Sequence, residues 1–299
     1  MSVQPIEIVK PLVPPSVRRL LNRTIRAPGR EVLRRGQAVA EQAVHRAFPN
    51  GLAGESFHPI FEISDQDIAI IGAMKSGNVW FRHLAAGAMF GVDIRRAPPR
   101  LVQLLIPNLG LDRYYRRYGP TVFFLGHDLP RPEFRRVVYL LRDGRDATVS
   151  MYHHLLATRG EGRVDFLRMV RDGEGLYPCK WHEHVQAWRS NPYGADMITL
   201  RYEDLRADGV RELQRFCEFV GVERDRETLE AAVAGASFES MRSMEGRFGA
   251  QTDQRWSSDK PFVRRGEVGS FRDEMSPEVL AAFMIEAEQT LMETGYLTA

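Results

Sequence analysis

The stretch Ile68-Ala69-Ile70-Ile71-Gly72-Ala73-Met74-Lys75-Ser76-Gly77 decides the fold. Its first four residues are apolar and mostly β-branched, which is typical of a buried parallel strand. A glycine-containing turn follows, and residues 76–90 then have the composition of a helix. Because a helix begins with unpaired N–H groups and partial positive charge, this strand–loop–helix predicts an anion-binding site, to which Lys75 adds a full charge.

Strands and helices alternate through the rest of the chain. Residues 121–125, 137–141 and 197–201 are further strand candidates, and a helix is predicted over 146–156. Asp204 is a candidate cap for the helix that follows the last of these strands. This alternation predicts an α/β fold, with a central parallel β-sheet flanked by helices on both faces.

The composition limits the class of protein. The chain has 299 residues with 43% hydrophobic content and a net charge of +2, which suits one large α/β domain with an added arm and argues against nucleic-acid binding. Cys179 and Cys217 lie in no array of metal-ligand spacing, so we expect no metal site. The few cysteines and the absence of a signal-like or membrane-spanning run predict a cytoplasmic protein.

The N-terminal part of the chain differs from the rest. Residues 1–50 contain nine lysines and arginines against three acidic residues, with helical propensity that is broken near Pro28-Gly29. We therefore expect residues 1–60 to form a basic, helical arm before a domain over 61–299. Solvated or core-packed helices are one interpretation, and contact with an anionic membrane or a subunit is the other.

The phosphate loop does not have the spacing of the nucleotide triphosphatases. Those proteins need four residues between their glycines and then Gly-Lys-Ser/Thr, whereas here the order is Gly72-x-x-Lys75-Ser76-Gly77. This counts against a P-loop kinase, which remains an alternative. Taken alone, the loop is also compatible with a surface lysine in a turn.

Six segments together resemble the sulfotransferases that use 3′-phosphoadenosine 5′-phosphosulfate (PAPS). Lys75–Trp80 resembles the family's 5′-phosphosulfate loop, Pro-Lys-Ser-Gly-Thr-Thr-Trp. Five more segments follow in the family's order: Gly126–Pro130 with the catalytic histidine, Val138–Ser150 with the 3′-phosphate motif, Arg201–Leu205, Ser237–Met241 and Phe262–Gly269. The resemblance spans residues 68–271 and implies a P-loop-like α/β core.

The resemblance also implies roles for individual residues. His127 is the expected general base, since a histidine with a pKa near 6.5 is largely neutral at pH 7. Lys75 is expected to stabilise the leaving phosphate. The residues expected to bind PAPS, or its product PAP, without a metal, are Lys75, Ser76, Gly77, Asn78, Val79, Trp80, Arg142, Ser150, Tyr202, Ser237, Phe238, Arg264, Arg265 and Gly266.

The acceptor is left open by the sequence. A hydroxyl of a glycan, a lipid or a small metabolite is expected, and a catalytically inactive binding protein of this fold is a further alternative. The arginines of residues 91–120 favour either an anionic acceptor or a solvated basic surface. Trp181, His184 and Trp188 share one helical face, which predicts core packing. Arg145 is expected to pair with Asp143 or Asp146.

Three departures from the family pattern distinguish this chain. Val79 stands where the family has the second threonine of the loop, and Leu125 stands where many members have a lysine. The family's short C-terminal dimerisation segment is also not found upstream of Arg264. The departures indicate a member distant from the animal phenol and steroid enzymes, of a bacterial type.

Overall fold

The computed structural model describes residues 57–249, 256–257 and 260–298. The chain divides into two units between Phe57 and His58, and the description below concerns the second. The predicted arm, residues 1–60, lies outside the described residues except at its end, where Phe57–Pro59 forms strand β1. None of the helices in the described part is long and apolar enough to cross a membrane.

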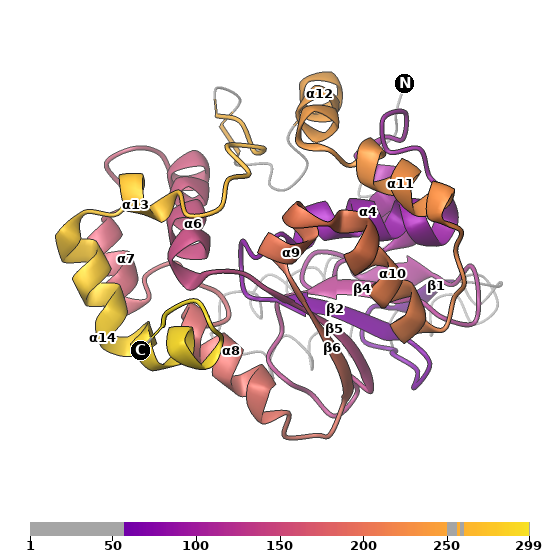
Figure 1. Cartoon of the computed structure of the whole chain (residues 1–299), viewed down its shortest axis with the longest axis horizontal. Helices are drawn as coiled ribbons and strands as arrows, with labels where there is room; N and C mark the ends of the chain where they lie inside the picture. Colours follow the sequence, from indigo (N-terminus) through magenta and orange to yellow (C-terminus); the bar gives the residue numbers. More distant parts are fainter. Residues whose placement is uncertain (1–56, 250–255, 258–259, 299) are drawn as a thin grey trace, which may run out of the picture. The chain divides into compact units, whose positions relative to one another are not determined.

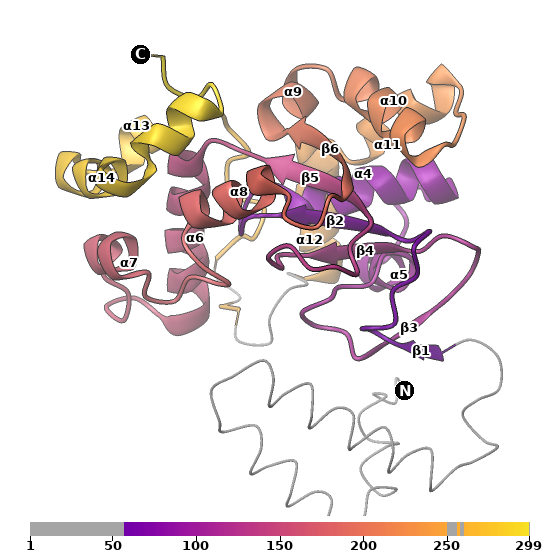
Figure 2. The same ribbon diagram turned by 90° about the horizontal axis from the view of Figure 1, so that it is seen from below.

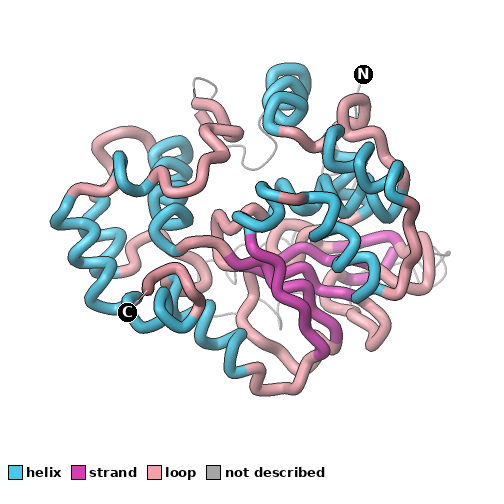
Figure 3. The backbone as a smooth tube through the Cα atoms, viewed as in Figure 1, coloured by secondary structure: helices cyan, strands magenta, loops and turns pink. Residues whose placement is uncertain are grey.

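The centre of the domain is a parallel sheet with strand order β4-β2-β5-β6 (Figure 3). The strands are β2 (Ile68–Gly72), β4 (Phe123–Gly126), β5 (Arg136–Leu141) and β6 (Asp196–Arg201). All three pairings are parallel. This confirms the predicted α/β class, and each strand lies within two residues of its predicted bounds.

Helices cover both faces of the sheet (Figures 1 and 2). In β2, Ile68 and Ile70 belong to one hydrophobic cluster, whereas Ala69 and Ile71 belong to the other. Successive side chains of a strand point to opposite faces, so this alternation builds two cores against one sheet. The first core is closed by α4, α9, α10 and α11, and the second by α6, α7, α8, α13 and α14.

The bounds of the helices and of the remaining strand are as follows: α4 Asn78–Phe90, α5 Pro99–Leu105, β3 Tyr114–Arg116, α6 Gly144–Arg159, α7 Phe166–Asp172, α8 Trp181–Ser190, α9 Tyr202–Ala207, α10 Gly209–Val220, α11 Arg226–Gly235, α12 Phe238–Phe248, α13 Phe271–Glu274 and α14 Pro277–Glu293. Strands β1 and β3 form a separate two-stranded sheet.

The helix that follows β5 and the helix that follows β2 begin differently. The carboxylate of Asp143 accepts a hydrogen bond from the N–H of Arg145 and so caps α6. Helix α4 begins after Gly77 with no side-chain cap. The first N–H groups of α4 are therefore left for another partner, which is the property that the sequence predicts for an anion site.

The predicted cap at Asp204 is wrong. Strand β6 passes directly into α9, so Asp204 lies in the first turn of that short helix. A second helix, α10, begins after Asp208, whose carboxylate accepts from the N–H of Arg211 at 3.0 Å. Two helices therefore follow β6 where the sequence indicates one, and the cap belongs to the second.

Gly144 provides a direct test of the packing at the start of α6. A Cβ at this position would clash with the indole of Trp181, a buried residue. We expect Gly144→Ala to lower the free energy of unfolding by about 1–3 kcal/mol because the packed indole cannot move aside. Chemical denaturation measures the change.

Gly246 is the matched control, because it lies in α12 and a Cβ there meets nothing within 4 Å. Gly246→Ala should raise stability by roughly 0.5–1 kcal/mol through the loss of backbone freedom in the unfolded chain. Equal effects of the two substitutions would contradict the close approach of Gly144 and Trp181.

Candidate active site

The phosphate loop joins β2 to α4 in a backbone conformation that few sequences allow. Lys75 has φ of 68° and Gly77 has φ of 92°, both in the left-handed region. A Cβ on Gly77 would lie 2.8 Å from the ring of Tyr202, and a Cβ on Gly72 would lie 2.7 Å from the carbonyl oxygen of Leu140. The two glycines are thus required by close packing, and the left-handed Lys75 is a strained residue of the kind that concentrates at functional sites.

Several polar atoms of this site are buried without a partner. Ser76 is 2% exposed and Arg142 is 8% exposed. The Oγ of Ser76, the Nε of Arg142 and the Oδ1 of Asn78 have no hydrogen-bond partner among the described residues. Because an unpaired buried polar group is costly, such atoms indicate a place for a polar ligand. Two of the three are donors, which fits an anion.

Lys75 lies in a cationic environment. Burial lowers the pKa of Lys75 to about 8, and the charges of Arg142 and Arg264 add to the shift. The ammonium group is 4.6 Å from the centre of the Phe262 ring. Arg142 donates to the carbonyl oxygen of Lys75 at 3.3 Å, and its guanidinium lies 4.3 Å from the ring of Tyr202. The structure thus brings together three of the predicted donor-binding cations.

Aromatic side chains stand beside these cations. Trp80 and Tyr202 meet edge to face with ring centres 5.3 Å apart. The hydroxyl of Tyr202 donates to the carbonyl oxygen of Gly266 at 3.0 Å, and a Cβ on Gly266 would lie 2.9 Å from the ring of Phe238. Four residues predicted to bind the donor therefore lie together, although they come from four separate segments.

Three further residues predicted to bind the donor lie on helices or at a helix start. The Oγ of Ser237 caps α12 by accepting from the N–H of Ser240 at 3.2 Å, so this hydroxyl already serves the helix. Ser150 lies half-buried on α6, eight residues beyond Arg142. Val79 is half-buried in the first turn of α4 and offers its backbone only.

Carboxylates hold the segment from Phe262 to Phe271 in place. Asp146 is fully buried and accepts from the N–H groups of Gly269 at 2.7 Å and Phe271 at 2.9 Å. Glu245 accepts from the N–H of Val263 at 2.9 Å. These bonds fix the backbone of this segment, which we call the closing loop and which contains the predicted donor-binding residues Arg264, Arg265 and Gly266.

Arg264 and Arg265 both contact one carboxylate. Glu274 accepts from Arg264 at 2.6 Å and from Arg265 at 3.4 Å. The same carboxylate lies 2.7 Å from the Nε2 of His153. Burial alone would raise the pKa of Glu274, but the hydrogen bonds with Arg264 and His153 lower it below its usual value. Glu274 therefore partly neutralises the two arginines.

His127 is held in one tautomer. It follows β4, and its Nδ1 lies 2.8 Å from the carbonyl oxygen of Gly72. Since a carbonyl only accepts, Nδ1 carries the proton and Nε2 has a free lone pair. Burial lowers the pKa of His127 below its usual value. The hydrogen bond to Gly72 and the charge of Asp128 oppose this shift, and the charge of Lys75 adds a smaller lowering. A neutral imidazole near a lysine can accept a proton at Nε2.

The aromatic face of α8 has a role beyond the predicted core packing. Trp181, His184 and Trp188 are buried, as expected. Each also donates a hydrogen bond to a backbone carbonyl at the sheet edge: Trp181 to Arg142 at 3.1 Å, His184 to His127 at 3.2 Å and Trp188 to Asp128 at 2.9 Å. The helix therefore fixes the residues that follow β4 and β5.

His184 is itself oriented by a neighbouring strand. The hydroxyl of Tyr139 lies 3.0 Å from Nδ1 of His184, so Tyr139 donates and Nε2 of His184 remains the donor to His127. Burial lowers the pKa of His184 to about 3, which keeps the ring neutral. One feature of the sequence could have indicated this network. Trp181, His184 and Trp188 were predicted to be buried, and a buried indole N–H or imidazole needs a hydrogen-bond partner.

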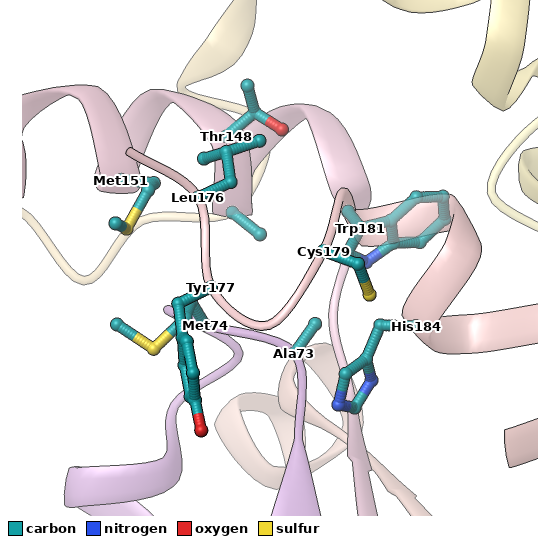
Figure 4. Close-up of a pocket in the computed structure, with 10 residues that line it drawn as sticks. Ala73, Met74, Thr148, Met151, Leu176, Tyr177, Cys179, Trp181 and His184 are labelled. Carbon is teal, nitrogen blue, oxygen red and sulfur yellow. The ribbon is translucent and has the colours of Figure 1, made fainter. Parts of the chain in front are cut away.

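A small pocket adjoins the phosphate loop (Figure 4). Its walls come from the loop, from α6, from the segment before α8 and from α8 itself. The lining residues are Ala73, Met74, Ala147, Thr148, Met151, Leu176, Tyr177, Cys179, Trp181 and His184. The lining is mainly apolar, and it includes both the residue before Lys75 and the histidine that holds His127.

Other expected features of the chain are also described. Arg145 pairs with Asp143 at 2.7 Å, one of the two partners that the sequence predicts. Leu125 is fully buried in β4 opposite Ile70, so its side chain belongs to the core. Within the described residues, no group of three or more His, Cys, Asp or Glu side chains could hold a metal ion.

A family model named for the sulfotransferase domain matches residues 131–295, more than half of the chain. The protein belongs to the sulfotransferase family. Sulfotransferase 1E1 of Bos taurus is 23% identical over 79% of this chain and 88% of its own length. Sulfotransferase 1A1 of Bos taurus is 27% identical over 71% of this chain and 79% of its own length. The resemblance seen in the sequence motifs is thus confirmed at the level of the family.

Solved structures share the fold. Retinol dehydratase in a complex with retinol and PAP has a TM-score of 0.61 at 18% identity, covering 79% of this chain and 84% of its own. Mouse sulfotransferase SULT7A1 complexed with PAP has a TM-score of 0.56 at 17% identity, covering 79% of this chain and 87% of its own. At these identities the likeness establishes the α/β architecture of the family.

His184→Phe tests the support that α8 gives to the active site. The substitution keeps an aromatic ring in the core but removes the bond to the His127 carbonyl and leaves the Tyr139 hydroxyl without its acceptor. We expect the free energy of unfolding to fall by about 1–3 kcal/mol, since two buried polar groups lose their partner. The double substitution Tyr139→Phe/His184→Phe should recover part of this loss, and urea unfolding measures both. Independent, additive losses would contradict the network.

Proposed function

We propose that this sulfotransferase moves a sulfuryl group from PAPS to a hydroxyl group, with His127 as the general base. One arrangement carries the proposal. A neutral histidine with a free Nε2 stands within electrostatic range of a half-buried lysine, and this lysine lies in the loop that directly precedes the uncapped start of α4. Sulfuryl transfer needs a proton acceptor on one side of the sulfur and positive charge on the other, and these residues supply both.

The proposed reaction can be followed atom by atom. The acceptor oxygen forms a bond to sulfur while its proton passes to Nε2 of His127. The bond between sulfur and the bridging oxygen of the donor breaks, and its electron pair stays with the phosphate of PAP. Lys75 and the N–H groups of α4 stabilise the negative charge on that phosphate. No step requires an oxidant, and the proton leaves His127 to solvent after release of the product.

The donor assignment depends on the 3′-phosphate. Arg142 offers a buried Nε without a partner among the described residues. Arg264 and Arg265 lie in the closing loop, whose Glu267 carbonyl accepts from Arg142 at 3.1 Å. We assign these arginines to the 3′-phosphate of PAPS, with Ser76 and the N–H of Asn78 at the 5′-phosphate. Arginine can pair two donors with one phosphate, so this cluster distinguishes PAPS from a nucleotide without the 3′-phosphate.

We propose that the acceptor is a hydroxyl compound whose remaining structure is mainly apolar. The pocket beside the phosphate loop has Met74, Met151, Leu176 and Tyr177 in its walls (Figure 4). Thioether and aromatic side chains accept apolar ligands of varied shape. Of the three acceptor classes that the sequence leaves open, this favours a lipid or a hydrophobic metabolite over a glycan.

The two alternative functions are disfavoured for separate reasons. A kinase would need a magnesium-binding acid beside the phosphate loop, whereas Lys75 has arginines as its charged neighbours. An inactive binding protein would not need His127 in a tautomer that leaves Nε2 unprotonated. Measurements of PAP binding and of turnover in the His127→Ala variant distinguish these alternatives from a sulfotransferase.

Arg142→Ala tests the donor. Calorimetry with PAP and with adenosine 5′-phosphate should show a loss of PAP affinity of roughly a hundredfold, because about two charge-assisted hydrogen bonds disappear. Affinity for adenosine 5′-phosphate should change much less. Arg145→Ala is the control, since its guanidinium is bound to Asp143 and to the Tyr296 carbonyl. Equal affinity of the wild-type protein for both nucleotides would refute the assignment.

His127→Ala tests the base, once mass spectrometry with PAPS has identified an accepted alcohol or phenol. We expect turnover to fall by about 10²–10⁴-fold while PAP affinity is kept. In the wild-type protein, kcat/KM should rise with pH through the depressed pKa of His127, below about 6.5, because the base must lose its proton. It should fall again near pH 8 as Lys75 loses its charge.

The rise of kcat/KM with pH should disappear in the residual activity of His127→Ala. The control is His58→Ala, which removes an exposed histidine paired with Glu62; both the rise and the fall of kcat/KM with pH should be kept in this variant. Turnover that is unchanged in His127→Ala would mean that another group accepts the proton.

A further inference from the structure

We infer that the domain carries a surface that binds anionic lipid membranes, formed by α5 and the segment from Gly110 to Tyr118. This goes beyond the proposed function, because it concerns a face that the donor site and the pocket do not use. Helix α5 and strand β3 contact each other, and they lie together at the end of the domain away from α7 and α14 (Figure 2).

Exposed apolar side chains concentrate on this surface. Five of the fourteen large apolar side chains that are exposed among the described residues fall within residues 91–120. They are Leu101, Leu104, Leu111, Tyr114 and Tyr118, each between 40% and 62% exposed. Scattered single exposures are ordinary on soluble proteins, but a cluster of this kind marks a contact surface.

The local structure directs these side chains outward. In α5, Val102 is fully buried while Leu101 and Leu104 are exposed. Residues three apart share a helix face, so the two leucines form one outward stripe. In β3, Tyr115 is buried and Tyr114 and Arg116 are exposed, as strand alternation requires. The outward faces of both elements therefore carry apolar side chains together with arginine.

The charge of the surface identifies the partner. Residues 91–120 contain six arginines and two aspartates. Asp93 is paired with Arg95 and Arg96, and Asp112 accepts from Gln103 and the N–H of Asn108. Arg117 pairs with Asp67. Both aspartates are thus engaged within the protein, and the remaining arginines determine the outward charge.

Those remaining arginines are Arg100, Arg113 and Arg116. All three are exposed, and no carboxylate within the described part of the chain pairs with them. The guanidinium of Arg116 lies 5.6 Å from the ring of Tyr118. Leucines that insert among acyl chains, tyrosines at the headgroup level and unpaired arginines on phosphates are the combination that an anionic bilayer binds.

The surface is rigidly connected to the catalytic edge of the sheet. The N–H of Leu125 donates to the carbonyl of Pro107 at 2.8 Å, and the N–H of Leu109 donates to the carbonyl of Leu125 at 2.8 Å. The segment after α5 thus lies along β4, two residues before His127. A membrane bound at α5 would hold this edge near the lipid.

The test uses the full chain and sedimentation with vesicles of phosphatidylcholine alone or with about 30% phosphatidylglycerol. We expect binding to the anionic vesicles only. Arg100→Gln/Arg113→Gln/Arg116→Gln should weaken it by roughly a hundredfold, since each arginine contributes about a factor of five near the surface. Leu101→Ser/Leu104→Ser should weaken it by about tenfold or more through the lost apolar insertion.

The matched controls are Arg168→Gln and Ile285→Ser, which remove an exposed arginine and an exposed apolar side chain on α7 and α14. Both should bind vesicles as the wild-type protein does. PAP affinity reports the fold of every variant without depending on lipid, so a failure of vesicle binding is distinguishable from a failure of the donor assignment. The inference is overturned if the wild-type protein does not bind anionic vesicles, in which case a protein partner would be the occupant of this surface. It is also overturned if the arginine and leucine variants bind vesicles as tightly as the wild-type protein does, because another segment would then bind the membrane.

Discussion

Crowded, partly buried positive charge is the constraint on which the site depends. Lys75 stands in a left-handed conformation in the loop after β2, where the charges of Arg142 and Arg264 act on it. Burial is the main cause of the lowered pKa of Lys75, and these two like charges lower it further. A bound anion would offset the repulsion between these cations, and the phosphosulfate of the proposed donor carries such negative charge. The left-handed lysine, the two glycines and the uncapped helix all favour the binding of an anion at this place.

Hydrogen bonds from the rest of the domain hold that arrangement in place. Asp146 and Glu245 fix the closing loop through its backbone N–H groups. Helix α8 donates hydrogen bonds to three carbonyls at the ends of β4 and β5. Residues held in this way need little reordering to reach the geometry of the transition state, so more of the binding energy can stabilise that state. The imidazole of His127 is oriented from both directions, by the Gly72 carbonyl at its ring and by His184 at its backbone.

The sequence predicted the parallel sheet well because apolar, β-branched runs between helices have few alternatives. It also predicted the family and the cluster of Lys75, Arg142 and Tyr202, since the motifs occur in a fixed order. It did not predict that Ser237 caps α12, or that two helices follow β6, because local capping depends on where the chain turns. The contribution of α8 was missed for a physical reason. Spacing shows that Trp181, His184 and Trp188 share a face, but their hydrogen-bond partners come from strands far away in the chain. Glu274, which contacts two of the predicted donor-binding arginines, carried no signal at all.

The cation cluster can be measured directly through the ionisation of Lys75, by NMR of its side-chain nitrogen across a pH titration with and without PAP. In the free protein the account predicts a pKa near 8, well below the ordinary value of 10.5. Saturation with PAP should move it upward, because the phosphate favours the charged lysine. A free-protein pKa close to the ordinary value, unchanged by PAP, would contradict the account, since Lys75 would then be neither crowded by the arginines nor in contact with the donor.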